Sequence, residues 1–180
     1  DLFGCYSKAN AKVYSDNKKS ELKIKVFGDP EYVEHVLRYY HFGNSNIIEI
    51  ARKEIGNKGG EKYWRWYGFN QRENWCAIFV SWCANESGII NNTIPKFSLC
   101  TDGVKWYKDH NKWENKSYIP QTGDIIFFDW NGDGHVQHVG IVEKEENGKV
   151  YTIEGNSNDE VRNKSYSLNN KSIYGYGSVN

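Results

Sequence analysis

Two cysteines seven residues apart, Cys76 and Cys83, lie in an apolar run and are the first candidates for chemistry. A thiol is a useful nucleophile only as a thiolate. The first turn of a helix favours the thiolate, because unsatisfied N–H groups and the helix dipole attract negative charge. Cys76 is expected at such a position, whereas Cys83, two turns further along, is expected to fill the core. Position alone leaves the catalytic and the structural interpretation of Cys76 about even, so the decision rests on a base.

His138 is the candidate base. It opens a predicted strand at residues 138–142, and its neighbour on the same face, Gly140, has no side chain to block a substrate. A single histidine on a strand is usually structural, so the assignment needs a group that orients the imidazole. Three other histidines lie in polar segments and are interpreted as surface residues: His35, His41 and His110.

The next predicted strand supplies Glu154 and Asn156, which are two residues apart and so share a face. With a two-residue turn between the strands, neither would share a face with His138. A three-residue loop at residues 146–148, or a bulge with the same effect, would place Asn156 opposite His138 and Glu154 opposite Gly140. The catalytic interpretation therefore requires that loop or bulge.

Cys76, His138 and an orienting group would together perform acyl transfer. The thiolate attacks a carbonyl, and backbone N–H groups at the helix start, including that of Cys76, stabilise the oxyanion. The imidazolium protonates the leaving amine, and water then hydrolyses the thioester. A glycosidase fits poorly, because the sequence offers no clear pair of facing carboxylates beyond Glu154.

The elements that must position these groups are helices first and strands later. Apolar spacing and stop or cap signals predict helices at residues 46–55, 75–86 and 101–110, the last capped by Thr101. After Pro120, β-rich segments separated by turn residues predict strands at residues 124–130, 136–145, 149–154 and 172–176. We expect an α+β fold, with N-terminal helices packed on a C-terminal antiparallel β-sheet.

Residues 59–73 are predicted as a loop rich in aromatic side chains, which could line a binding groove or form a satellite of the core. We expect a mixture of the two. The candidate substrate-binding residues of this loop are Trp64, Trp66, Tyr67 and Phe69, with Gln71 and Asn74 as candidate oxyanion donors.

Residues 1–44 are interpreted as an N-terminal extension or linker, with a short strand at residues 21–27 and a helix at residues 31–40, and residues 45–180 as the catalytic domain. The sequence starts at Asp1 and has no Met, so we expect a piece of a longer protein. An upstream domain or membrane anchor would then lie outside this chain.

Charge and composition narrow the function further. Lys+Arg and Asp+Glu are balanced at 23 each in 180 residues, so no basic excess favours nucleic acid. No apolar run approaches the length of a membrane span. No spacing of Cys and His matches a zinc site, and neither a metal nor another cofactor is expected. A disulfide between Cys83 and Cys100 is geometrically possible, but the sequence does not decide whether it forms.

One loop resembles part of a calcium site. Asp129, Asn131 and Asp133 have the spacing of the first half of an EF-hand loop. The twelfth position is Gly140, where a bidentate Glu would be needed. A tight polar turn between strands is therefore favoured over calcium binding.

Four stretches resemble the CHAP family, the cysteine- and histidine-dependent amidohydrolases and peptidases with a papain-like core. They are WCAIFVSW (75–82), GDIIFFDWNGDG (123–134), HVGIV (138–142) and YTIEGNS (151–157). The resemblance covers residues 47–177 and implies Cys76 as nucleophile, His138 as base, and Glu154 with Asn156 as orienting groups. Family members often carry Asp directly before the histidine, where this chain has Gln137.

The resemblance is greatest to CHAP modules of Gram-positive bacteria, their phages and conjugative elements. It implies a secreted, envelope-associated or phage-delivered enzyme, expected to act as a monomer on peptidoglycan. The bond would be an amide, cut by an N-acetylmuramoyl-L-alanine amidase or a peptide endopeptidase. A papain-like protease acting on proteins and a non-catalytic wall-binding module are the alternatives, and intact Cys76, His138 and Glu154 argue against the module.

Overall fold

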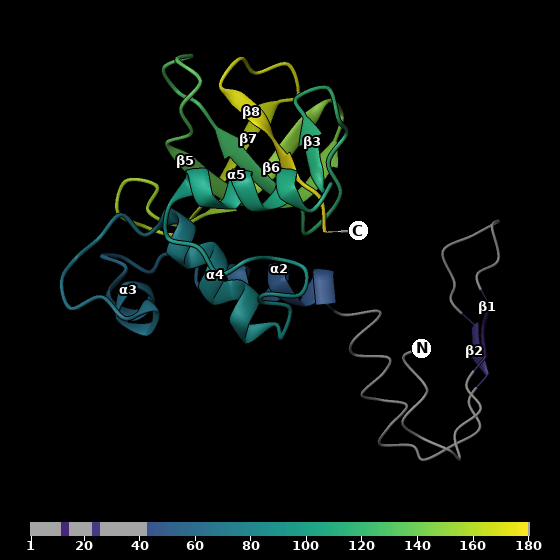
Figure 1. Ribbon diagram of the computed structural model, residues 1–180, viewed down its shortest axis with the longest axis horizontal. Helices are drawn as coiled ribbons and strands as arrows, with labels where there is room; N and C mark the ends of the chain where they lie inside the picture. The colour runs from purple at the N-terminus through teal and green to yellow at the C-terminus, as the bar shows by residue number, and fades with distance from the viewer. Residues whose placement is uncertain (1–11, 15–22, 26–42, 180) are drawn as a thin grey trace. The chain divides into compact units, whose positions relative to one another are not determined.

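The computed structural model describes residues 12–14, 23–25 and 43–179, and the chain divides into two compact units, residues 1–42 and 43–180. In the first unit, β1 (Lys12–Tyr14) pairs with β2 (Lys23–Lys25) in an antiparallel arrangement (Figure 1). β2 falls within the strand predicted at residues 21–27. The helix predicted at residues 31–40, with His35 and His41, lies outside the described residues.

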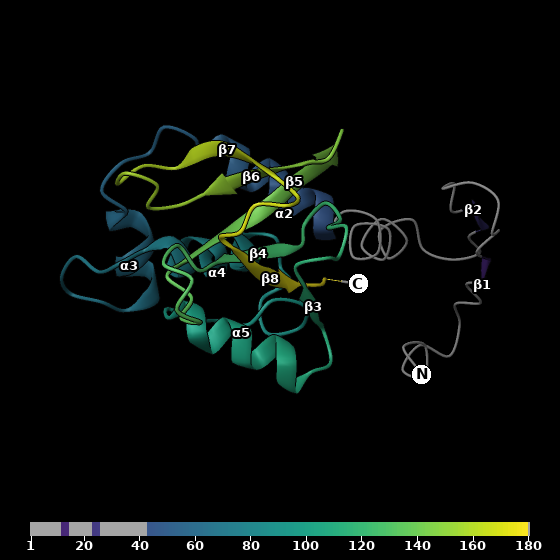
Figure 2. The same ribbon diagram turned by 90° about the horizontal axis from the view of Figure 1, so that it is seen from above.

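The described part of the second unit begins with helices. They are α2 (Gly43–Lys53), α3 (Glu61–Tyr67), α4 (Cys76–Glu86) and α5 (Cys100–Asp109). Figures 1 and 2 show α2 beside α4. α2 and α4 confirm the helices predicted from apolar spacing, and α4 is buried along nearly its whole length, as its apolar sequence requires. No helix in the described ranges has the length and apolarity needed to cross a membrane.

Two predictions about helices were wrong. The segment 59–73 is not all loop, because it contains α3, which starts after Gly60 (φ 64°) and ends at Gly68 (φ 117°). Both glycines adopt the left-handed conformation that side chains disfavour, so they delimit a helix that the aromatic residues had obscured. Thr101 does not cap α5, because the helix begins one residue earlier, after Leu99, and no side chain caps it.

The C-terminal half forms a six-stranded antiparallel sheet in the order β3-β8-β4-β5-β6-β7. The α+β prediction is therefore confirmed. Four strands match predicted segments: β4 (Ile125–Phe128), β5 (His138–Glu146), β6 (Lys149–Glu154) and β8 (Ile173–Gly177). The two edge strands were not predicted: β3 (Trp113–Asn115) and β7 (Arg162–Ser167). β3 is short, and β7 has the polar sequence RNKSYS without apolar alternation.

The two faces of the sheet are buried in different ways. On β4, Ile125 and Phe127 belong to the large core that also contains residues of α2, α4 and α5, whereas Ile126 and Phe128 belong to a smaller cluster on the opposite face. That smaller cluster contains sheet residues and the side chains of nearby loops. The helices therefore cover one face, and the smaller buried cluster lies on the other.

The register between β5 and β6 meets the condition that the catalytic interpretation requires, although not through the predicted loop. The turn has two residues, Asn147 (φ 54°) and Gly148 (φ 75°), so the three-residue loop was wrong. A bulge between Val142 and Lys144 then shifts the pairing by one residue, so that Ile141 lies opposite Ile153. This bulge confirms the alternative that the sequence had left open.

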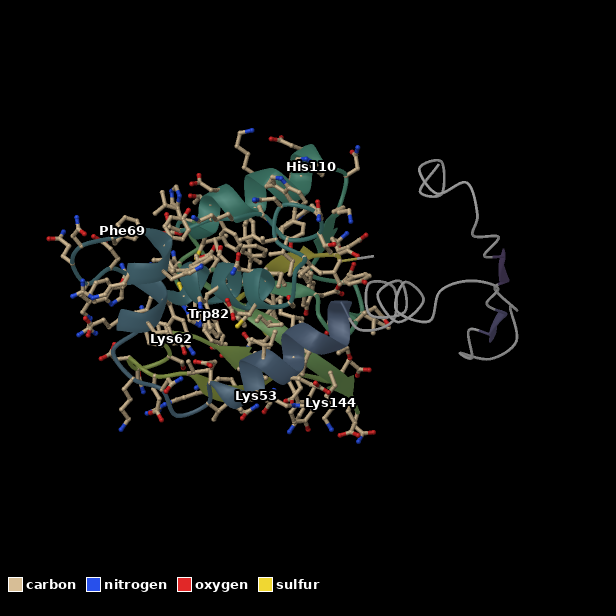
Figure 3. All side chains as sticks on the ribbon, turned by 90° about the horizontal axis from the view of Figure 1, so that it is seen from below. Lys53, Lys62, Phe69, Trp82, His110 and Lys144 are labelled. Carbon is tan, nitrogen blue, oxygen red and sulfur yellow. The ribbon has the colours of Figure 1, made fainter. Side chains whose placement is uncertain are left out.

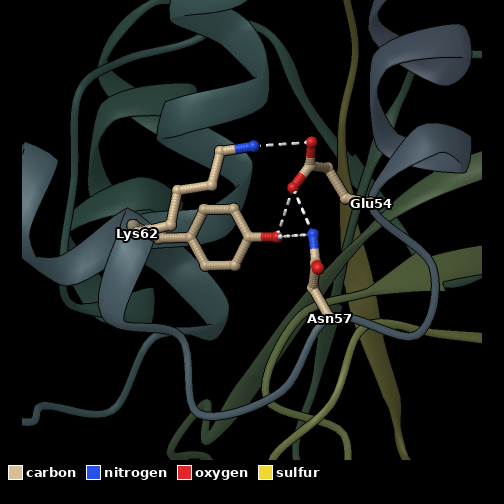
Figure 4. A network of polar contacts seen from close by, with 4 residues as sticks. Glu54, Asn57 and Lys62 are labelled. Atoms are coloured by element: carbon tan, nitrogen blue, oxygen red, sulfur yellow. Dashed lines mark hydrogen bonds and ion pairs between the residues drawn. The ribbon is translucent and has the colours of Figure 1, made fainter.

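A polar network around the buried carboxylate of Glu54 joins the segment after α2 to α3 (Figure 4). The Glu54 carboxylate accepts hydrogen bonds from Asn57 Nδ2 at 2.6 Å, Lys62 Nζ at 2.7 Å and Tyr63 Oη at 2.7 Å. Burial alone would raise the pKa of Glu54, but these donors outweigh it and lower the pKa below its ordinary value. Lys62 also lies over the ring of Trp82, 4.1 Å from its centroid (Figure 3).

Candidate active site

Cys76 is the first residue of α4, as predicted, and its side chain is almost completely buried at 6% exposure. No side chain caps this helix, so the N–H groups of its first turn remain available. The pKa of the Cys76 thiol lies well below its ordinary value, first because of the hydrogen bond that it shares with Cys100. A hydrogen bond and the charge of His138 and the N–H of Ala77 add to this, whereas burial acts in the opposite direction.

His138 opens β5 and faces both the thiol and a carboxylate. Its Nε2 lies 2.9 Å from Oε2 of Glu154, and its interaction with Cys76 also acts on the pKa of the imidazole. Because Nε2 is taken by Glu154, Nδ1 is the ring nitrogen left for the thiol. Burial disfavours the imidazolium, but the hydrogen bonds and negative charges of Cys76 and Glu154 outweigh it and raise the pKa of His138 to about 9.

Glu154, at the end of β6, is held by more than the histidine. Its side chain is 1% exposed, and Oε1 accepts hydrogen bonds from Thr152 Oγ1 at 2.6 Å and Tyr166 Oη at 2.9 Å. The absent side chain of Gly140 makes room for it, because a Cβ there would lie 2.7 Å from Glu154 Cγ. The carboxylate is thus fixed in place and fixes the imidazole in turn.

Asn156 lies in the turn after β6 with φ 59°, and it lines a pocket beside His138. The group that contacts the imidazole is Glu154. The two predicted orienting residues therefore differ in position: one touches His138, and the other borders the space in front of it.

The pocket beside the histidine has a volume of about 330 Å³. Lys164 is the only cationic side chain among its lining residues apart from His138. The indole of Trp130 stacks on Phe128 at 4.7 Å between ring centroids and forms part of the wall. The lining residues are Trp130, His138, Glu154, Asn156, Ser157, Asn158, Lys164 and Tyr166.

The six predicted substrate-binding residues lie elsewhere. Trp64 is 6% exposed and belongs to the core, where its Nε1 donates to the carbonyl of Gly59. Tyr67 stacks on Phe69 at 5.4 Å between ring centroids, and Lys96 lies over the Tyr67 ring. Three aromatics are half-buried, Trp66, Tyr67 and Phe69, and two polar residues are exposed, Gln71 and Asn74. Trp64 thus lies in the core, and the three half-buried aromatics pack against it as satellites.

The acidic loop between β4 and β5 is a tight turn. The Asp129 carboxylate accepts hydrogen bonds from the backbone N–H groups of Gly132, Asp133 and Gly134. The side-chain oxygen of Gln137 accepts the N–H of Trp130 at 2.7 Å and so braces this loop. Across the described ranges, no cluster of three or more His, Cys, Asp or Glu side chains could hold a metal.

The remaining cysteines and histidines are placed as follows. Cys83 is free and fully buried, which confirms its predicted role in the core. Cys100 is also free and contacts Cys76 rather than Cys83, so the disulfide considered between Cys83 and Cys100 is not formed. His110 is exposed at the C-terminal end of α5, stacked on Trp106 (Figure 3).

Sequence reasoning missed Cys100, Thr152 and Tyr166. The signal for Cys100 was its place near a helix start, but nothing local indicated that α5 begins beside α4. Thr152 shares a face with Glu154 and could have been proposed from the period of two. Tyr166 lies on the unpredicted strand β7, so no signal pointed to it.

Comparisons with known proteins found a family model, a relative and a solved structure similar to this chain. The CHAP domain family model matches residues 66–156, which include Cys76, His138, Glu154 and Asn156. The bifunctional muramidase/DL-endopeptidase CwlT of Bacillus subtilis (strain 168) is 29% identical over 168 residues, which are 87% of this chain. The chain spans 46% of the length of that relative. The crystal structure of Ly7917 matches with a TM-score of 0.48 and 15% identity, over 74% of this chain and 61% of that one. The family model covers half of the sequence, and the chain belongs to the CHAP domain family.

Proposed function

We propose that this protein is a cysteine-dependent hydrolase that cleaves an amide bond of bacterial cell-wall peptide. The observation that carries the proposal is the contact of Cys76 with His138 and of His138 with Glu154, within a CHAP domain. A buried thiol beside a charged imidazole is suited to acyl transfer.

The reaction proceeds through a thioester. The Cys76 thiolate attacks the amide carbonyl, and the N–H of Cys76 at the uncapped start of α4 donates to the oxyanion. The His138 imidazolium gives its proton to the leaving amine as the C–N bond breaks. The neutral imidazole then takes a proton from water, which attacks the thioester and releases the acid, and the thiolate and imidazolium are restored. Glu154 keeps the imidazole oriented through both halves.

Within this class, we favour a peptide endopeptidase over an N-acetylmuramoyl-L-alanine amidase. The relative CwlT is a muramidase and a DL-endopeptidase, and this chain matches less than half of it. A muramidase needs two carboxylates facing one another across a sugar. The candidate site has one buried carboxylate, Glu154, and it is tied to His138. The matched half of the relative therefore fits the endopeptidase, and this chain is proposed to share that chemistry.

Substrate is proposed to bind on both sides of the thiol. The pocket lined by Trp130, His138 and Tyr166 would receive the peptide on one side of the scissile bond. The half-buried rings of Trp66, Tyr67 and Phe69, with exposed Gln71 and Asn74 nearer the thiol in sequence, are proposed as a further contact surface. We propose that the enzyme acts outside the cell membrane as a monomer.

Purified cell walls incubated with the wild type and with Cys76→Ala test this proposal. The wild type is expected to release new free amines, and mass spectrometry of the fragments identifies the bond. Fragments ending within the peptide support the endopeptidase, and intact peptides freed from the sugar support the amidase. Fragments identical to those from Cys76→Ala would overturn the hydrolase.

The two alternatives have their own outcomes in the same assay. Binding to walls without release of amines would indicate a non-catalytic module. Cleavage of denatured protein with walls left intact would indicate a protease acting on a protein substrate. The intact arrangement of Cys76, His138 and Glu154 favours an enzyme over the non-catalytic module. The similarity to CwlT favours cell-wall peptide over a protein substrate.

A further inference from the structure

A second thiol touches the proposed nucleophile. Sγ of Cys100 lies 3.8 Å from Sγ of Cys76, and both side chains are buried. Each cysteine is the first residue of a helix, Cys76 of α4 and Cys100 of α5. Two helix starts therefore converge on one pair of sulfur atoms, at positions where N–H groups and helix dipoles favour a negative charge.

The two thiols can share one negative charge. The groups around each sulfur decide which of them is ionised. Cys76 contacts His138, which accepts a proton and becomes an imidazolium. Cys100 has the Cys76 sulfur as its side-chain partner. Burial and the adjacent thiolate raise the pKa of Cys100, with the hydrogen bond to Cys76 as the largest cause. Cys100 therefore keeps its proton when Cys76 has lost its own, and that S–H points at an anion.

We propose that Cys100 is a catalytic residue, whose S–H donates a hydrogen bond to the Cys76 thiolate and keeps the nucleophile ionised before attack. The inference rests on Cys76 being the nucleophile of the proposed function. No proton leaves Cys100 in the reaction. The hydrogen bond is strongest while charge resides on Sγ of Cys76 and weakens as that charge passes to the carbonyl oxygen.

This role predicts opposite effects in two ranges of pH. Loss of the donor raises the pH needed to form the thiolate, so reaction at neutral pH slows. A thiolate without the donor is more basic and more nucleophilic, so at high pH its reaction is as fast or faster. Damage to packing alone would slow the reaction at every pH.

The test is the pH dependence of iodoacetamide alkylation of Cys76 in the full, reduced chain, read by mass spectrometry of the Cys76 peptide. Cys100→Ala is expected to slow alkylation about tenfold at neutral pH, the size expected for one hydrogen bond to a charged group. It should reach or exceed the wild-type rate at high pH. Cys100→Ser keeps a donor and is expected to lie closer to the wild type.

Cys83→Ala is the matched control, because it removes another buried thiol of the same core that is not paired with Cys76. Should Cys100→Ala fail to fold, Cys100→Thr, which keeps a donor, is compared with Cys100→Val, which has similar volume and none. The pH midpoint of Cys76 alkylation is compared between variants. Equal midpoints in the wild type and Cys100→Ala, or in the Thr and Val variants, would overturn the inference.

The same data separate this inference from the proposed function. A wild-type Cys76 that reacts with the midpoint of an ordinary thiol contradicts the activated nucleophile itself. A low wild-type midpoint that survives Cys100→Ala contradicts only the role of Cys100. A low pH midpoint in the wild type that rises in Cys100→Ala and stays low in Cys83→Ala supports both the activated nucleophile and the role of Cys100.

Discussion

Glu154 is the residue on which the geometry of the site depends. Its side chain is 1% exposed, and its carboxylate hydrogen-bonds His138, Thr152 and Tyr166. These interactions are therefore made inside the protein. A buried carboxylate that lost these donors would be strongly destabilised. The residue therefore contributes to orientation and to the charge on His138 at once.

The pH dependence of activity follows from the two reacting groups. The thiolate–imidazolium pair exists above the lowered pKa of Cys76 and below the pKa of His138, about 9. We expect kcat/KM on a soluble wall peptide to rise as Cys76 ionises, at a pH well below the ordinary pKa of a thiol, and to fall above about pH 9 as His138 loses its proton. Both limbs report the pair rather than either residue. Activity that continues to climb beyond pH 9 would indicate an ordinary thiol and contradict this assignment.

The residues with local signals were predictable, and those with remote partners were not. Cys76 begins a helix and His138 begins a strand, and each position follows from nearby residues. Glu154 follows from the period of two once the bulge is assumed. Cys100 and Tyr166 reach the site from α5 and β7, and their contacts depend on how distant elements pack.

At the scale of elements, the bulge in β5 turns a two-residue hairpin into the register that the proposed catalysis requires. The sequence restricted the answer to a longer loop or a bulge, because the side-chain period is two. It did not decide between them, since Asn147-Gly148 favours the short turn and the bulge depends on neighbouring strands. The polar edge strand β7 was likewise invisible without its partner β6.

Gly140 tests this register directly. Gly140→Ala places a Cβ 2.7 Å from Glu154 Cγ, and the buried carboxylate cannot move freely. We expect kcat/KM for wall-peptide hydrolysis to fall by about 10- to 100-fold, the effect of misplacing a catalytic group, while circular dichroism stays unchanged. Lys144→Ala, in the exposed half of the same strand, is the control and should retain activity (Figure 3). Wild-type activity in Gly140→Ala would show that Glu154 does not orient His138.

The hydrogen bonds to Glu54 are expected to stabilise the folded protein. Glu54→Gln weakens three hydrogen bonds to a buried carboxylate and is expected to cost about 1–3 kcal/mol in urea unfolding at neutral pH. The folded-state pKa of Glu54 is lowered, so its contribution is present above the ordinary value of 4.5 and is lost as the pH falls through the folded-state pKa. The difference in unfolding free energy between the wild type and Glu54→Gln should therefore shrink as the pH is lowered.

Glu61→Gln provides the comparison for that experiment. Glu61 pairs with Arg65 on an exposed face of α3, and such surface pairs contribute at most about 1 kcal/mol. Equal destabilisation by Glu54→Gln and Glu61→Gln would mean that the buried network adds nothing to stability.

At the scale of the whole molecule, residues 43–180 contain every group assigned to the site and a core of their own. We predict that a chain beginning at Gly43 unfolds in one thermal transition and keeps kcat/KM within about twofold of the full chain, because a domain with its own core folds as a unit. Loss of catalysis on removing residues 1–42 would instead assign that segment to the catalytic unit.

Cys76 is proposed to carry the acyl group during hydrolysis. The most direct test of this role is rapid acid quenching of the enzyme with a synthetic wall peptide, followed by mass spectrometry of the Cys76 peptide. The wild type is expected to show a mass increase equal to the acyl fragment, removable by hydroxylamine and absent from Cys76→Ala. Hydrolysis at the wild-type rate by Cys76→Ala, or an acyl adduct on another residue, would contradict the account.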